Sequence, residues 1–282
     1  MDSNEVKNLQ IHAAHVRKMA LEAVHSAGAG HPGGSLSVAD ILTYLYLKEM
    51  NVKPDDAKNP DRDRFVLSKG HCSPALYGVL AEAGFIPKED IKGFRSIDSY
   101  LQGHPDMKKI NGVDMSTGSL GQGISCANGM ALAGKLDGKS YRVYTALGDG
   151  EIEEGQVWEA AMFAAHYKLD NLTAFLDYNG LQIDGDITKV MNSTPIDKKF
   201  EAFNWHVITI DAHDFNQIEA AVNEAKETKG KPTLILAKSV KGKGVSFMEG
   251  QAAWHGAAPN DEQYAQAISE LDAYIESLGG DK

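Results

Sequence analysis

Apolar positions recur along the chain with two different periods. From Leu9 to Ala27 they return every three to four residues, which is the period of a helix that buries one face, and glycine follows directly. Tyr141–Leu147 and Leu172–Leu176 are instead short apolar runs, typical of strands that are buried on both faces. The segment between these runs, Gly155–Tyr167, returns to the helical period. The pattern therefore predicts helices and strands in alternation.

The same two periods predict the other elements. Further helices are expected over Val38 to about Met50 (with Ser37 as its cap), Pro74–Ala83, Leu120–Lys135, Phe215–Ala225 and Tyr264–Leu278. Further strands are expected over Phe65–Leu67, Val207–Ile210 and Thr233–Ala237. The stretch from Gly180 to Pro195 has no clear period, so we expect a loop there.

This alternation predicts an α/β fold. Short buried strands that alternate with amphipathic helices form a mostly parallel sheet with helices on both faces. Sheets of this kind bind ligands beyond the carboxyl ends of their strands. Because the sequence contains no internal repeat and no low-complexity linker, we expect a single domain over residues 1–282.

Charge and composition narrow the possible functions. The chain has 28 Lys+Arg and 39 Asp+Glu, a formal net charge of −11, so we expect neither a nucleic-acid partner nor a membrane surface. The polar, acidic amino terminus does not look like a signal peptide, which favours a cytoplasmic protein. Cys72 and Cys126 are expected to be reduced thiols, because two cysteines cannot form a disulfide scaffold.

Gly28–Gly33 matches the G-x-G-x-x-G pattern of dinucleotide-binding sites. That pattern has to follow a strand and open a helix, whereas this copy follows a long predicted helix and contains Pro32. We therefore expect these glycines to allow a tight turn that presents His31 to a ligand.

Acidic and amide side chains follow two consecutive predicted strands. Asp149 is flanked by Gly148 and Gly150, and Asn179 follows the next strand 30 residues later. Parallel strands end at one edge of a sheet, so both side chains can reach the same crevice. Together with a carbonyl near Leu181 they offer oxygen ligands for Mg²⁺ or Ca²⁺ beside a diphosphate. The alternative is two ordinary turns. The pairing resembles the thiamine diphosphate motif of thiamine-dependent enzymes.

Four of the ten histidines lie beside glycine in predicted loops: His31, His71, His104 and His255. Such histidines can approach a ligand closely, donate to phosphate or hydroxyl oxygens, and transfer protons near neutral pH. Zinc binding is the weaker interpretation, because none of them has a partner at a recognised zinc spacing. The other six are expected to be packing or surface residues: His12, His15, His25, His166, His206 and His213.

The glycine–histidine loops and several other runs together resemble transketolase. These runs follow one another along nearly the whole chain: Ala29–Gly34, Leu67–Tyr77, Gln102–Asp106, Ser116–Gly123, Gly148–Gly155 and Trp254–Gly256. The resemblance implies a thiamine diphosphate-binding fold and a transferase that moves a two-carbon ketol unit from a ketose phosphate, such as xylulose 5-phosphate, to an aldose phosphate. In such an enzyme the cofactor supplies the electron sink.

The resemblance also implies roles for individual residues. Asp149, Asn179 and the Leu181 carbonyl would hold the metal ion. Contacts to thiamine diphosphate would come from His71, Gly118, Leu120, Gly150, Val240 and His255. Proton transfer at substrate oxygens would fall to His31 with His255, while His71 and His255 would lie near the cofactor and the reacting carbons. His104 would bind the terminal hydroxymethyl group of the donor.

Two glutamates, Glu154 and Glu159, match family residues at a subunit contact, where they are thought to couple paired sites. For the neighbouring Glu151 and Glu153 we prefer a simpler interpretation, namely acidic residues that favour a helix N-terminus.

The resemblance covers only part of the family's polypeptide. The family's further pyrimidine-binding and C-terminal domains would have to come from a separate chain, so we expect a split transketolase of the pentose phosphate pathway, inactive alone and assembled as α₂β₂. Three alternatives stay open. The chain could serve a specialised ketose phosphate, it could be the diphosphate-binding subunit of a 2-oxoacid dehydrogenase, or it could bind the cofactor or a partner without turnover.

Overall fold

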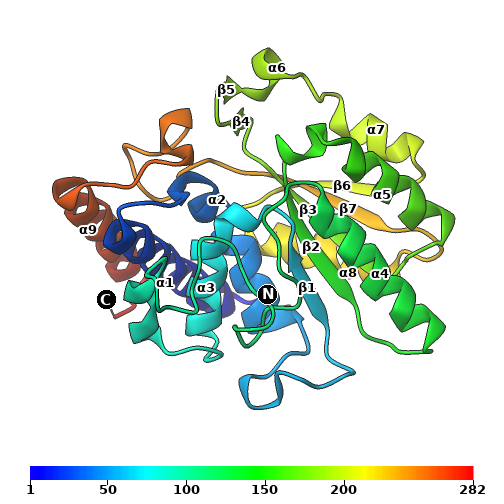
Figure 1. Ribbon diagram of the computed structural model, residues 1–282, viewed down its shortest axis with the longest axis horizontal. Coiled ribbons are helices and arrows are strands. Elements are labelled where there is room, and N and C mark those ends of the chain that lie inside the picture. The colour runs from blue at the N-terminus through cyan, green and yellow to red at the C-terminus, as the bar shows by residue number, and fades with distance from the viewer. Residues whose placement is uncertain (282) are drawn as a thin grey trace.

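Five parallel strands form the central sheet of the computed structural model, which describes residues 1–281 (Figure 1). In spatial order they are β1 (Arg64–Leu67), β2 (Val143–Gly148), β3 (Leu172–Tyr178), β7 (Thr233–Lys238) and β6 (His206–Asp211). The register places Leu147, Leu176 and Leu236 side by side. All five strands therefore present their carboxyl ends at one edge, and the predicted α/β fold is confirmed.

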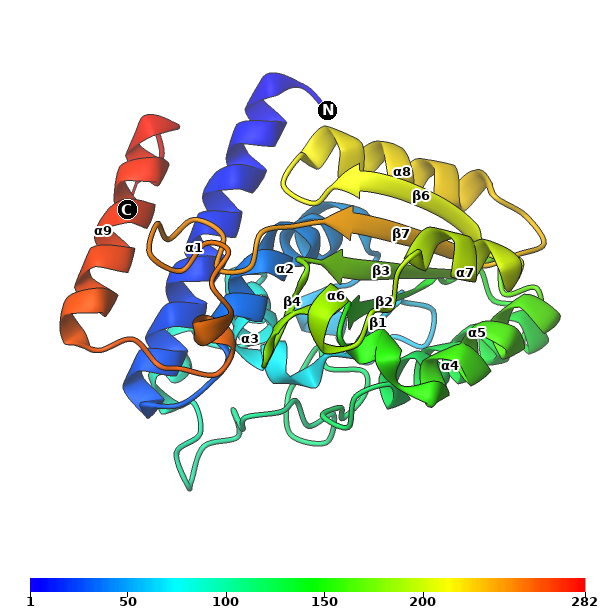
Figure 2. The ribbon, with the colours of Figure 1, turned by 90° about the horizontal axis from the view of Figure 1, so that it is seen from above.

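Helices cover both faces of this sheet (Figure 2). One face carries α4 (Gln122–Leu136), α5 (Gly155–His166) and α7 (Ile196–Ala202). The other carries α2 (Pro32–Tyr44), α3 (Ser73–Glu82) and α8 (Phe215–Glu227). Beyond these lie α1 (Ser3–Ala27), which packs on α2 and α3, and α9 (Asp261–Ser277), which packs on α1.

The strand residues explain why the sheet needs helices on both sides. Along β2, Tyr144 and Ala146 join one hydrophobic core while Val143 and Leu147 join the other. β1, β2, β3 and β7 are thus buried on both faces, which accounts for their apolar runs, whereas the edge strand β6 is only partly buried.

The structure corrects the predicted start of the second helix. It begins at Pro32, not Val38, because proline is well suited to the first helical position and every residue of α2 is buried by tertiary packing. Ser37 is therefore not a cap. It lies inside the helix, and its hydroxyl donates to Asp177 Oδ2 at 2.5 Å, with the Gly34 carbonyl 3.0 Å away.

Shorter elements complete the chain. A two-stranded hairpin of β4 (Leu181–Gln182) and β5 (Gly185–Asp186), followed by α6 (Ile187–Val190), lies within the predicted loop, and α7 was not predicted. The single-turn and π-helical segments are Leu45–Glu49, Pro54–Asp56, Gly70–Cys72, Lys88–Gly93, Glu151–Glu153 and Ala252–His255. Both cysteines are free. None of the helices within residues 1–281 is long and apolar enough to cross a membrane.

Candidate active site

The carboxyl ends of β2 and β3 meet at Asp149. Its carboxylate is buried and accepts two backbone hydrogen bonds, from Gly150 N–H at 2.9 Å and from Gly180 N–H at 2.6 Å. Gly180 has φ +76°, a conformation that favours glycine, and this turn directs its N–H toward the carboxylate. Asp149 thus ties the end of β2 to the turn that follows β3.

The other two predicted metal ligands belong to that same turn. Asn179 Oδ1 accepts from Leu181 N–H at 3.1 Å, and the Leu181 carbonyl accepts from Lys241 Nζ at 3.2 Å. The carboxylate of Asp149 and the residues Asn179 and Leu181 therefore come together at the sheet edge, as the strand spacing predicts.

Within residues 1–281, no lysine, arginine or histidine forms an ion pair with the carboxylate of Asp149. Burial and the neighbouring Asp177 raise the pKa of Asp149 to about 7. Asp177 itself is well compensated, because it bonds the Lys69 ammonium and the hydroxyls of Ser37 and Ser239. A hard divalent ion with oxygen ligands would supply the missing charge at Asp149, so the residues present fit such an ion.

Three histidines from separate segments face one another beside this edge. His31 precedes α2, His71 lies in the turn between β1 and α3, and His255 ends the Ala252–His255 turn. Their ring centroids are 5.1 Å (His31–His71), 5.4 Å (His31–His255) and 5.2 Å (His71–His255) apart. We call these three residues the edge histidines.

The edge histidines are held neutral. Burial, and then nearby positive charge, lowers the pKa of His31 and His71 to about 4 and that of His255 to about 3. Nδ1 of His31 is buried and has no hydrogen-bond partner among the described residues. A buried polar atom of this kind needs a partner, and a polar ligand at the sheet edge would provide one.

Lys241 fixes the proton position of one of these rings. Its ammonium lies 3.0 Å from His255 Nδ1. An ammonium only donates, so Nδ1 accepts and the proton of the neutral ring is on Nε2. Lys241 is itself buried, and burial lowers the pKa of its ammonium. The sequence predicts no role for this lysine or for Lys69, although Lys69 lies within the run Leu67–Tyr77 and both cations stand beside the strand ends where an anionic ligand is expected.

The loop before α4 brings a glycine against a histidine. Gly118 has φ +150°, and a Cβ there would lie 3.0 Å from His104 Cγ and Cδ2, so a larger residue would strain the backbone and push against the His104 ring. Leu120 is half-buried in this loop, and Thr117 Oγ1 nearby is buried without a partner among residues 1–281. His104 thus packs against Gly118, and the positive charge that His71 could carry helps to lower the pKa of His104 after burial.

Glu151 has a different role from the one that its position along the chain predicts. It is buried, and Oε1 accepts from Ser68 Oγ at 2.5 Å and Gly121 N–H at 2.9 Å, while Oε2 accepts from Gly148 N–H at 3.0 Å. It precedes α5, which begins only at Gly155. The interpretation as a helix N-terminal charge therefore fails for Glu151, which joins three segments of the edge.

Two predicted site residues, Val240 and Glu154, lie outside the group formed by Asp149 and the edge histidines. Val240 donates its N–H to His213 Nε2 at 3.0 Å, and His213 Nδ1 donates to Asp40 Oδ2 at 2.7 Å. His213, predicted to be a packing residue, thus holds the backbone of Val240 through a buried carboxylate. Glu154 is exposed beside Gly121 and does not join the edge histidines.

This arrangement can perform several tasks at one place. It offers carboxylate, amide and carbonyl oxygens for a cation, buried ammonium groups for an anion, and three neutral imidazoles that donate, accept and move protons.

Comparison with known proteins agrees with this geometry. Residues 8–273 match the family described as transketolase, thiamine diphosphate binding domain. The chain is 46% identical over 270 residues to the 6-deoxy-6-sulfo-D-fructose transketolase subunit of Clostridium sp. (strain MSTE9), covering 96% of this chain and 98% of that protein. It is 42% identical over 274 residues to an apulose-4-phosphate transketolase subunit of Phocaeicola vulgatus, covering 97% of each.

Longer relatives and a solved structure match as well. Human transketolase is 43% identical over 278 residues, covering 98% of this chain and 44% of that protein. The crystal structure of transketolase from Campylobacter jejuni superposes with a TM-score of 0.89 at 35% identity, covering all of this chain and 44% of the other.

Proposed function

This chain belongs to the transketolase family, and we propose that it is the diphosphate-binding subunit of a split transketolase that acts on a specialised ketose phosphate or a related substituted ketose. The observation that carries the proposal is the meeting of Asp149, Asn179 and Leu181 with the edge histidines at one sheet edge. We also propose that residues 1–282 form a single domain, which is supported by one family match over 8–273.

In the proposed complex, oxygen atoms of Asp149, Asn179 and Leu181 hold Mg²⁺ (or Ca²⁺), and Gly150 lines the diphosphate. The buried ammonium of Lys241 adds a positive charge beside the Leu181 carbonyl. Gly118 and Leu120 offer backbone groups to the other end of the cofactor, and Val240 packs on it. The bound thiamine diphosphate supplies the electron sink for breaking and making a carbon–carbon bond.

The edge histidines act on the oxygens of the sugar. Because their pKa values are low, they enter the reaction neutral, with His255 carrying its proton on Nε2. A neutral imidazole N–H can donate to a developing alkoxide, and a free imidazole lone pair can take a hydroxyl proton. We assign these roles to His31, His71 and His255, and the binding of the donor's terminal hydroxymethyl group to His104.

Two relatives favour a specialised substrate over xylulose 5-phosphate. The proteins that this chain matches over their nearly full length are named for 6-deoxy-6-sulfo-D-fructose and for apulose 4-phosphate. The relatives described above are all named transketolases, which also disfavours a 2-oxoacid dehydrogenase subunit.

We propose further that a second subunit, with the pyrimidine-binding and C-terminal domains, completes the enzyme as α₂β₂. The outer face of α5 supports this partner. It exposes Met162 at 58% and Phe163 at 37%, with Tyr167 at 46% directly after the helix, and Glu159 lies one turn before Met162 and Phe163. Apolar side chains gathered on one face of a helix are typical of a surface that another chain covers.

The test is calorimetric titration of thiamine diphosphate with Mg²⁺ into the chain, with and without a partner encoded beside it. A ketol-transfer assay then compares xylulose 5-phosphate, apulose 4-phosphate and 6-deoxy-6-sulfo-D-fructose as donors. We expect turnover only in the mixture, and faster turnover with one of the last two donors.

Three other outcomes would contradict parts of this proposal. Turnover by the chain alone would overturn the split-enzyme assignment. Cofactor binding without any turnover would favour a binding protein. Preference for xylulose 5-phosphate would contradict the specialised substrate and indicate the general transketolase reaction of the pentose phosphate pathway.

A further inference from the structure

A second histidine cluster lies away from the sheet edge, where α1 packs against α3. His12 and His15 are three positions apart on α1, so their side chains share one face of the helix. Glu82 is the last residue of α3 and faces them. We call His12, His15 and Glu82 the α1–α3 cluster.

Three ligand-type atoms converge in this cluster. His12 Nδ1 lies 2.7 Å and His15 Nδ1 lies 3.2 Å from the same oxygen, Oε1 of Glu82. All three atoms lie within 4.8 Å of one another. The second carboxylate oxygen, Oε2, pairs with Lys88 Nζ at 2.6 Å and leaves Oε1 to the two rings. Two imidazole nitrogens and one carboxylate oxygen form a set that Zn²⁺ binds, with water in the remaining position.

His15 has a second contact on the far side of its ring. Its Nε2 lies 3.4 Å from the backbone carbonyl of Asp281. In the metal-free chain both rings hydrogen-bond Glu82. With a metal ion on Nδ1, the proton of the neutral His15 ring is on Nε2, and Asp281 becomes the outer carbonyl partner that metal-bound histidines usually have.

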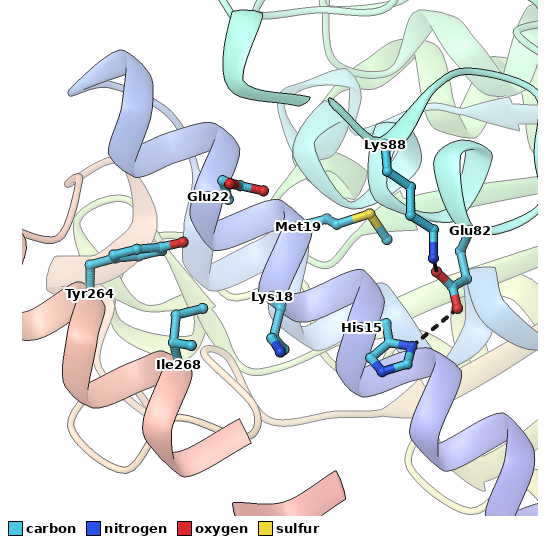
Figure 3. Close-up of a pocket in the computed structure, with 8 residues that line it drawn as sticks. All are labelled: His15, Lys18, Met19, Glu22, Glu82, Lys88, Tyr264 and Ile268. Carbon is cyan, nitrogen blue, oxygen red and sulfur yellow. Dashed lines mark hydrogen bonds and ion pairs between the residues drawn. The ribbon is translucent and has the colours of Figure 1, made fainter. Parts of the chain in front are cut away.

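Burial and access also suit an ion. The Glu82 side chain is only 4% exposed, whereas His12 is 43% exposed and can adjust its position. A cavity of about 300 Å³ between α1, α9 and the segment after α3 opens beside His15 and Glu82 (Figure 3). Tetrahedral zinc ligands lie roughly 3.3 Å apart, given Zn–ligand distances near 2.0–2.2 Å. The separation of Glu82 Oε1 from His12 Nδ1 therefore has to open from 2.7 Å by about 0.6 Å, and that from His15 Nδ1 from 3.2 Å by about 0.1 Å. The two nitrogens already lie within 4.8 Å of each other.

We propose that the α1–α3 cluster binds one Zn²⁺ ion through Nδ1 of His12, Nδ1 of His15 and Oε1 of Glu82. The ion would cross-link α1 to the end of α3 and stabilise their packing on the sheet. This site is distinct from the oxygen ligands around Asp149, which suit a harder ion such as Mg²⁺.

The test uses the full chain without a histidine tag, with excess Mg²⁺ present to occupy oxygen sites. Calorimetric titration with ZnCl₂ should show one Zn²⁺ per chain, and Zn²⁺ should raise the melting temperature, because a ligand of the folded state stabilises it. Co²⁺ in place of Zn²⁺ should give visible absorption bands. In the variant His12→Gln/His15→Gln we expect the zinc affinity to fall at least ~tenfold and the thermal shift to disappear.

The matched control is His25→Gln/His206→Gln, which removes two histidines that each face a single carboxylate, Asp261 or Glu224. This control should bind Zn²⁺ like the wild type. His15→Gln alone gives the same comparison if the first double variant does not fold. Absence of a zinc site in the wild type, or equal zinc affinity in the two double variants, would overturn the proposal.

Discussion

The two histidine clusters use the same side chain in opposite surroundings. The edge histidines, His31, His71 and His255, have no carboxylate bonded to their rings among the described residues, and a lysine ammonium donates to one of them. In the α1–α3 cluster, His12 and His15 both contact the carboxylate of Glu82. The edge therefore disfavours a positive charge on the rings, while the α1–α3 cluster favours a cation among them.

The carboxylates of the two regions differ in the same way. At the edge, the carboxylate of Asp149 accepts hydrogen bonds from the backbone N–H groups of Gly150 and Gly180. A cation there binds oxygen atoms and leaves the imidazoles available for proton transfer. In the α1–α3 cluster the rings themselves are the ligands. We infer that where the carboxylate stands decides whether a histidine cluster suits catalysis or metal binding.

The largest expected effect comes from removing the edge carboxylate. Asp149→Ala should abolish Mg²⁺-dependent binding of thiamine diphosphate, a loss greater than the ~100-fold typical of losing an outer partner of a metal ligand. Calorimetric titration of the cofactor measures it. Zinc binding at the α1–α3 cluster should be unchanged in this variant. Normal cofactor affinity would refute the assignment of Asp149 to the metal ion.

The second largest effect compares the loss of one imidazole from each histidine cluster. His31→Ala should lower kcat of the assembled enzyme by roughly 10²–10⁴-fold, the range for losing a group that transfers protons. His12→Ala, an equal loss of one imidazole, should change kcat by less than roughly twofold, because His12 lies near the surface and away from the sheet edge. Steady-state ketol transfer compares them. Equal losses in both variants would mean that the clusters do not differ in function.

Whether a site residue could be predicted from the sequence depends on how far along the chain its contact partner lies. The acidic motif at Asp149 and the turn at Asn179 are local signals at strand ends, and the sequence reveals them. Glu151 acts on Gly121, 30 residues away, and His213 acts on Asp40, 173 residues away. No local pattern marks such partners.

The errors in the predicted elements have the same cause. The start of α2 was misplaced because Pro32-Gly33-Gly34 has low helix propensity, yet every residue of this helix is buried and tertiary packing decides. The α1–α3 cluster was also missed as a candidate site. His12 and His15 share a helix face by their spacing alone, but only the fold brings Glu82 to them.

A smaller effect is expected from the fourth glycine-flanked histidine. His104→Ala in the assembled enzyme should lower kcat/KM for donors with a terminal hydroxymethyl group by roughly 10–100-fold, the cost of one lost hydrogen bond to substrate. Cofactor affinity should remain nearly normal, because we assign the His104 side chain to the donor's hydroxymethyl group and the cofactor contact beside it to the backbone of Gly118. Loss of cofactor binding, measured by the same titration as for Asp149→Ala, would contradict this role.

The smallest effect is a difference in acid sensitivity between the two regions. The pKa of His71 is about 4 in the folded chain, against an ordinary value of 6.5. Between these pH values His71 is protonated in the unfolded chain but neutral in the folded chain. The free energy of unfolding therefore falls as the pH drops from 6.5 to 4. Glu82 behaves differently. Burial alone would raise the pKa of Glu82, but hydrogen bonds from His12, His15 and Lys88 lower it well below 4.5. The ionised Glu82 therefore stops stabilising the fold only in more acidic solution.

Urea unfolding of the metal-free chain at a series of pH values measures both contributions. Asp149 acts in the opposite direction, because its pKa is raised and its folded carboxyl takes up a proton as the pH drops. The informative quantity is therefore the difference between variants and wild type. His71→Gln should flatten the loss between pH 6.5 and 4 by up to ~1.4 kcal/mol per pH unit, and Glu82→Gln should leave that window unchanged. If Glu82→Gln flattens the same window, the two clusters respond to acid alike, and the contrast between a neutral edge and a cation-binding cluster fails.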